Sequence, residues 1–121
     1  MRTRRPKVTI IYKICRQEEW RAAEAAGAYR GAPVDKQDGF IHFSTAAQLA
    51  ETAARHFAGV ADLMLVAVDT AALDGALKWE PSRGGALFPH LYADLPLTAV
   101  RWAQPLPDEV GGQRSLPELD A

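Results

Sequence analysis

The chain has 121 residues, which predicts one domain long enough to bury its own core. Hydrophobic residues make up 48% and charged residues 24%, as is typical of soluble globular proteins, and the net charge of -1 argues against general nucleic-acid affinity. No apolar run approaches the length of a membrane span and no signal peptide is recognisable, so a cytoplasmic protein is expected. The single cysteine, Cys15, excludes an intrachain disulfide and is expected to be a buried thiol.

The first elements are predicted from β-branched residues and helix punctuation. Residues 8–15 (VTIIYKIC) are typical of a strand, and residues 17–26 are predicted to form a helix that ends at Gly27. Residues 28–38 lack periodicity and contain Gly and Pro, so a loop is expected there. A second strand over 40–43 then runs into a helix over 46–57.

The second half of the chain is predicted to be mostly strands. Residues 62–69 form a continuous apolar run, 77–80 are expected to return as a short strand, and 97–104 give one more strand. The predicted organisation is a disordered basic N-terminus over 1–7, one α+β domain over 8–104, and a poorly ordered tail with Pro and Gly over 105–121.

Two short signatures stand out as candidate pocket segments. They are residues 39–45 (GFIHFST) and 88–94 (FPHLYAD), and each sets a histidine among apolar residues with a hydroxyl residue two positions on. An imidazole donates, accepts and titrates near neutral pH, which makes it suitable for a binding or catalytic site.

The first signature places His42, Ser44 and Thr45 at a strand-to-helix junction. An imidazole, two hydroxyls and the N–H groups of a helix start could together bind an anion or a carbonyl. The alternative is structural: His42 would be a buried ring bonded to backbone. Thr45 and Gln48 would then form an ordinary capping box.

The second signature makes His90 and Tyr92 candidate ligand contacts on one side of an extended segment. The alternative is that His90 faces water while its apolar neighbours fill the core. Trp79 and Glu80 end a predicted strand, where the carboxylate could act as a base, or else stand exposed before Pro81.

Two further side chains are candidate ligand contacts. Tyr12 lies in the middle of the first strand, and Arg30 precedes the first signature, where it could clamp a phosphate or simply be solvated. Metal-ligand spacings such as HxH or HExxH are absent from the sequence, as are Walker-type and GxGxxG phosphate loops, so no metal site is predicted.

These motifs, taken in order, resemble the bacterial family catalogued as domain of unknown function 952. The resemblance covers about residues 10–104. It differs at Phe43, where a smaller residue is expected, and at Ala93-Asp94, where Gly-Pro is expected. It is carried by Ile11-Tyr12-Lys13-Ile14, Glu19-Trp20, residues 39–45, Gln48, Val68-Asp69, Leu73, Trp79-Glu80 and residues 88–100.

The resemblance implies an ADP-ribosylation-like α+β fold, in which two small β-sheets and two or three helices form a cleft for NAD. By this analogy His42 would contact the ribose or the carboxamide, flanked by Ser44 and Thr45. Glu80 would be catalytic, and Tyr92 or Tyr12 would stack on the ring. His42 and Glu80 are therefore the predicted catalytic residues.

The predicted function is binding of NAD or a related nucleotide, with ADP-ribosyl transfer or NAD hydrolysis as its chemistry. The alternative is a non-catalytic module that holds a small ligand or a protein segment in the same cleft. NAD is the expected ligand or substrate rather than a certain cofactor, and the expected partner is a small molecule rather than a membrane. An RNA-processing role is disfavoured, because the chain has no basic stripe.

Overall fold

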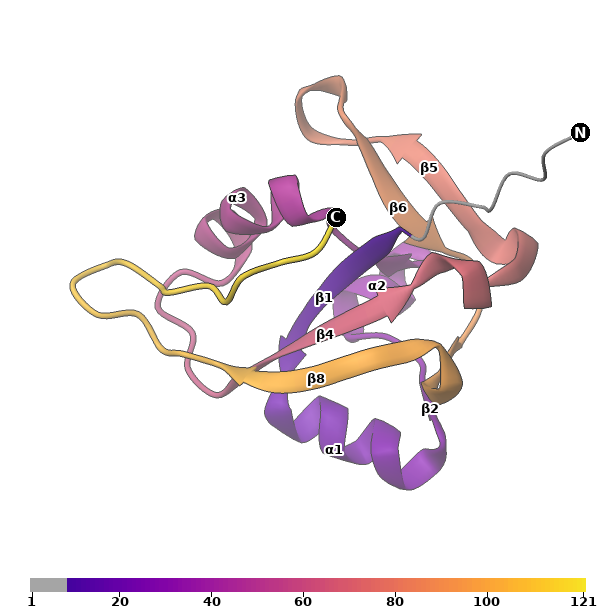
Figure 1. The fold of residues 1–121 in the computed structure, drawn as a ribbon, viewed down its shortest axis with the longest axis horizontal. Helices are drawn as coiled ribbons and strands as arrows, with labels where there is room; N and C mark the ends of the chain where they lie inside the picture. Colours follow the sequence, from indigo (N-terminus) through magenta and orange to yellow (C-terminus); the bar gives the residue numbers. More distant parts are fainter. Residues whose placement is uncertain (1–8) are drawn as a thin grey trace, which may run out of the picture.

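The largest sheet is formed by strands from the beginning, the middle and the end of the chain (Figure 1). The computed structural model describes residues 9–121, apart from the side chains of Asp74 and Arg83. Strands β1 (Ile10–Arg16), β4 (Leu63–Asp69) and β8 (Val100–Leu106) form an antiparallel sheet in the order β1-β4-β8. β4 is central and almost wholly buried, as its uninterrupted apolar sequence predicts.

Two smaller antiparallel sheets complete the fold. β3 (Ile41–His42), β6 (Leu87–Leu91) and β5 (Leu77–Pro81) pair in the order β3-β6-β5. β2 (Ala28–Tyr29) pairs with β7 (Leu95–Pro96). The α+β class is confirmed, but the expected pair of sheets is wrong, because β2 and β7 make a third one.

In the described part of the chain, three α-helices flank the sheets: α1 (Gln17–Ala26), α2 (Pro33–Asp38) and α3 (Ala46–His56). α1 ends at Gly27, which takes the left-handed conformation (φ 88°) expected of a helix cap. None of the described helices has the length and hydropathy that a bilayer-spanning helix needs.

The core is divided by the large sheet into two layers. Ile10, Tyr12 and Ile14 of β1 pack with Leu49 and Ala53 of α3. The alternate β1 residues belong to the other layer, which also contains α1 and the two small sheets; its buried members include Ile11, Cys15, Trp20, Tyr29, Ile41 and Leu91. Lys13 shares its side of the strand with this second layer, which places an ammonium group among apolar side chains.

Three local expectations are corrected. The predicted loop over 28–38 contains β2 and α2; Pro33 starts this helix and Gly39 (φ 89°) ends it, but six residues are too few for a periodic signal. Residues 97–99 form a 3-10 turn, so the last strand begins at Val100. Strand β8 continues through Pro105. A proline is tolerated there because β8 lies at the edge of its sheet.

Side chains of the C-terminal segment 105–121 contact the rest of the fold. Leu116 and Leu119 pack against the layer that contains α3, and Arg114 donates to the carbonyls of Phe57 and Val60. Apolar side chains within a polar segment therefore extend the core. The predicted disorder of 1–7 lies outside the described residues.

Candidate functional site

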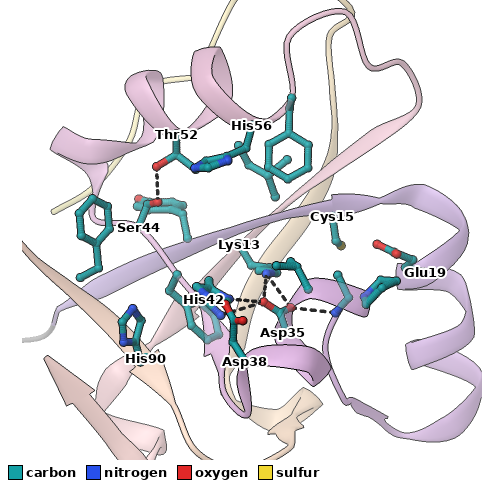
Figure 2. A pocket seen from close by; sticks show the side chains of 18 of the residues that line it. Lys13, Cys15, Glu19, Asp35, Asp38, His42, Ser44, Thr52, His56 and His90 are labelled. Carbon is teal, nitrogen blue, oxygen red and sulfur yellow. Dashed lines mark hydrogen bonds and ion pairs between the residues drawn. The ribbon is translucent and has the colours of Figure 1, made fainter. Parts of the chain in front are cut away.

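A cavity of about 600 Å³ lies beside β1, with α3 on one side and α2 on the other (Figure 2). This volume is in the range of small-molecule sites. Side chains from β1, α2, β3, α3 and β6 line it, so segments distant in the chain meet here. The polar and charged members of the lining are Tyr12, Lys13, Cys15, Arg16, Glu19, Asp35, Asp38, His42, Ser44, Thr52, His56, Ser82 and His90.

Asp35 is the centre of a buried polar network beneath this cavity. Its carboxylate accepts from Lys13 Nζ at 2.8 and 3.1 Å, and its Oδ1 lies 2.6 Å from His42 Nδ1. The backbone N–H groups of Ala32 and His42 donate to the same carboxylate at 2.7 and 3.1 Å. Gly31 allows the close approach, because a Cβ there would lie 2.8 Å from the Cβ of Asp35.

These contacts keep Asp35 ionised. Burial raises the pKa of this carboxyl group, but the hydrogen bond from His42 and the ammonium of Lys13 outweigh it and hold the pKa at about 2. The side chain of Asp35 is 1% exposed and that of Lys13 is 7% exposed. The network therefore places a buried ion pair directly behind the His42 ring.

His42 is held between two carboxylates. Nδ1 faces Asp35, and Nε2 lies 3.0 Å from Oδ2 of Asp38, the last residue of α2. Each nitrogen of the ring therefore faces a carboxylate acceptor. The orientation of the ring at the cavity is therefore fixed by these two carboxylates.

His90, the histidine of the second signature, belongs to the same site. His42 and His90 are register partners between β3 and β6, and their ring centroids are 5.5 Å apart. Phe40 stacks on His90 with centroids 4.1 Å apart and also contacts His42. The two signatures therefore meet at one wall of the cavity.

His90 is positioned by Glu80. Its Nδ1 lies 2.8 Å from Oε1 of Glu80, which also accepts from the hydroxyl of Tyr92 at 2.7 Å. The hydrogen bonds from Tyr92 and His90 lower the pKa of Glu80, and the same carboxylate raises the pKa of Tyr92. With Nδ1 engaged, Nε2 is the nitrogen of His90 left for a ligand among the described contacts.

The opposite wall is hydroxyl-rich. Ser44 Oγ lies 2.8 Å from Thr52 Oγ1 on α3. The hydroxyl of Tyr12 donates to the carbonyl of Asp120 at 2.6 Å, and burial raises the pKa of this phenol. Tyr12 and Ser44 are also paired through their backbones, which joins β1 to the start of α3.

Five of the predicted site residues do not line this cavity. Thr45 caps α3 and accepts from the backbone N–H of Gln48 at 3.2 Å, so its structural interpretation is confirmed. Trp79 is 42% exposed, and Glu80 lies behind His90. Arg30 and Tyr92 line a smaller hollow of about 230 Å³, where Arg30 pairs with Asp94 at 3.5 Å.

Sequence reasoning missed Lys13, Asp35 and Asp38. Lys13 carried a usable signal, because a charged residue in the middle of an apolar strand needs a buried partner. Asp35 and Asp38 lay in the segment interpreted as a loop, so nothing in their spacing connected them to His42. Their role depends on α2, which the sequence did not indicate.

Cys15 lines the cavity but is a poor nucleophile. It is 1% exposed, and burial raises the pKa of its thiol to about 12. Among the described residues, no three His, Cys, Asp or Glu side chains are grouped as metal ligands. The side chains that line the cavity offer hydrogen bonding, charge and proton transfer by histidine.

Comparison with known proteins agrees on the family. The family described as "Protein of unknown function (DUF952)" matches residues 14–103. The crystal structure of protein CC0527 from Caulobacter crescentus is similar with a TM-score of 0.84 and 48% identity, covering 88% of this chain and 94% of that one. Its solution NMR structure gives a TM-score of 0.76 and 48% identity, covering 85% and 89%. No curated protein matches the sequence. The chain therefore belongs to the DUF952 family of proteins of unknown function.

Proposed function

We propose that this protein binds a small polar molecule in the cavity beside His42, and that the ligand is a nucleotide such as NAD. The observation that carries the proposal is the buried Lys13–Asp35–His42 network, which holds an imidazole at the wall of a cavity of ligand size. The choice of NAD follows the ADP-ribosylation-like fold that the sequence motifs imply.

The energetic argument for a ligand site rests on the cost of the network. Removing charges from water is expensive, and well-packed apolar residues in place of a buried ion pair are often neutral or stabilising. Stability alone therefore gives little reason to place Lys13 and Asp35 in this core. Holding the His42 ring in one orientation for a ligand gives such a reason.

A titration of isotope-labelled protein with NAD tests the proposal. Amide shifts are expected at Lys13, Asp35, residues 39–48 and residues 88–94, which surround the cavity. His42→Ala is expected to abolish these shifts with an unchanged circular dichroism spectrum. Arg101→Gln serves as the control, because Arg101 is exposed on β8 and pairs with Asp69. Absence of shifts at millimolar NAD would remove NAD as the ligand.

A second candidate function, ADP-ribosyl transfer or NAD hydrolysis, is favoured by the contact between Glu80 and His90. In this scheme His90 touches the ligand, and Glu80 orients the ring and supports a proton on it. Release of nicotinamide from NAD distinguishes this enzyme from a non-catalytic binding module. If turnover occurs, Glu80→Gln is expected to reduce it while the NAD-induced shifts at residues 39–48 remain.

A further inference from the structure

The two carboxylates that contact His42 differ in how firmly they are held. Asp35 is 1% exposed and its oxygens accept from Lys13, from the His42 ring and from two backbone N–H groups. Asp38 is 42% exposed, and His42 Nε2 is the partner of its carboxylate among the described contacts. The inner contact is therefore fixed, whereas the outer one is replaceable.

The outer contact also lies where a ligand arrives. His42 and Asp38 both line the cavity, and the side chain of His42 is 34% exposed. Exposed ion pairs are weak, so an anion in the cavity can compete with the Asp38 carboxylate for the same N–H.

We propose that an anionic group of the ligand replaces the Asp38 carboxylate at Nε2 of His42. The position of this carboxylate thus marks an anion subsite that the free protein fills with its own side chain. The inference rests on the proposed ligand cavity and adds the chemistry of one end of the ligand.

His90 indicates which ligand group would lie next to that anion. The tautomer of His90 that donates Nδ1–H to Glu80 offers Nε2 as a hydrogen-bond acceptor. The centroids of the two imidazoles are 5.5 Å apart, so one small molecule reaches both. A ligand with an anionic group near a hydroxyl fits this donor and acceptor, and sugar phosphates and nucleotides carry both groups.

The test uses ribose 5-phosphate as the probe, with ribose and inorganic phosphate as its parts. Protein with ¹⁵N-labelled histidine rings is titrated, and the ring resonances of His42 and His90 are followed. Ribose 5-phosphate is expected to shift both rings, inorganic phosphate to shift His42 alone, and ribose to bind much more weakly than either. Ribose binding as tightly as its phosphate would overturn the assignment of His42 to an anion.

Asp38→Ala tests the replacement directly. Removing the competing carboxylate is expected to tighten the Kd for ribose 5-phosphate about three- to tenfold. Asp94→Ala is the matched control, because it removes the same charge from an exposed carboxylate outside the cavity lining. If both variants tightened the Kd equally, the change in net charge alone would explain the tighter binding, and the proposal would be overturned.

Failure of this inference is distinguishable from failure of the ligand site. Ligand shifts at Lys13 and His90 with an unchanged Kd in Asp38→Ala would leave the cavity as a binding site and refute the exchange of anions. No binding of ribose 5-phosphate or NAD to any variant would refute both proposals.

Discussion

The chemistry of this site depends on one buried carboxylate. Asp35 neutralises Lys13, orients His42 and accepts from two backbone N–H groups of the segments that flank it. Loss of a partner from a buried ion pair is much more costly than loss of an exposed one, because the remaining charge is left without compensation. The same residue therefore determines local stability and the geometry of the site.

Asp35→Asn is expected to lower the free energy of unfolding by about 3 to 5 kcal/mol, since Lys13 would remain buried without a counter-charge. The double variant Lys13→Met with Asp35→Asn is expected to lose less than the sum of the single variants. Urea unfolding followed by circular dichroism measures Lys13→Met, Asp35→Asn and the double variant. Simple additivity of the two losses would contradict a direct coupling of these side chains.

Acid is expected to remove the contribution of Asp35 to the free energy of unfolding over a defined pH range. The pKa of Asp35 is about 2 in the folded protein, below its ordinary value of 3.8, so the unfolded chain takes up the proton first. The resulting stabilisation, about 2 kcal/mol, is complete above pH 3.8 and is lost as the pH falls from 3.8 to about 2. Unfolding measured across this range should show the loss in the native protein. A loss of equal size in Asp35→Asn would assign it to other groups.

At the scale of elements, α3 is positioned by its first turn. The Thr45 hydroxyl accepts from the backbone N–H of Gln48. In return, the side-chain oxygen of Gln48 accepts from the backbone N–H of Thr45 at 3.0 Å. Gln48 also donates to the carbonyl of Leu87 at 2.8 Å, which ties the helix to β6. This turn therefore sets the distance between two walls of the cavity.

Thr45→Ala is expected to lower the free energy of unfolding by about 1 kcal/mol through loss of the cap. Thermal unfolding measures the change, and Thr98→Ala, at an exposed threonine, should stay within about 0.5 kcal/mol of the native protein. Ligand-induced shifts at His42 should be the same in Thr45→Ala as in the native protein. A loss of those shifts would instead give Thr45 a place in binding.

How much the sequence could predict differs from element to element. Uninterrupted apolar runs and helix caps predicted β1, β4, α1 and α3 close to their observed bounds. The histidine signatures identified His42 and His90 as candidates, because an imidazole among apolar residues has few ordinary reasons to be there. Asp35 escaped prediction, since a six-residue helix has no period to detect and its partners depend on tertiary folding.

At the scale of the whole molecule, the C-terminal tail closes the structure around α3. Arg114 is 4% exposed and donates to the carbonyls of Phe57, Val60 and Pro107 at 2.8 to 3.1 Å. Leu116 and Leu119 continue the core beyond the last strand, and the carbonyl of Asp120 accepts from Tyr12. The tail therefore supports the side of β1 that carries Tyr12.

Arg114→Ala is expected to lower the free energy of unfolding by about 3 kcal/mol, because three carbonyls lose a charged donor. Arg101→Ala removes an exposed ion pair and should cost less than about 1 kcal/mol. Chemical denaturation of both variants provides the comparison. Equal losses would mean that the tail contributes little to the cooperative fold.

Because Cys15 is buried, the rate at which its thiol is alkylated measures how often the cavity opens. The thiol is protonated and inaccessible while β1 is in place, so an alkylating reagent can react only in conformations that have opened. It is the only cysteine in the chain, so the mass of the protein rises in a single step. A molecule that occupies the cavity keeps the closed form populated and slows this labelling in proportion to its saturation. Candidate ligands can thus be ranked by labelling rate alone, without knowing what reaction, if any, the protein catalyses.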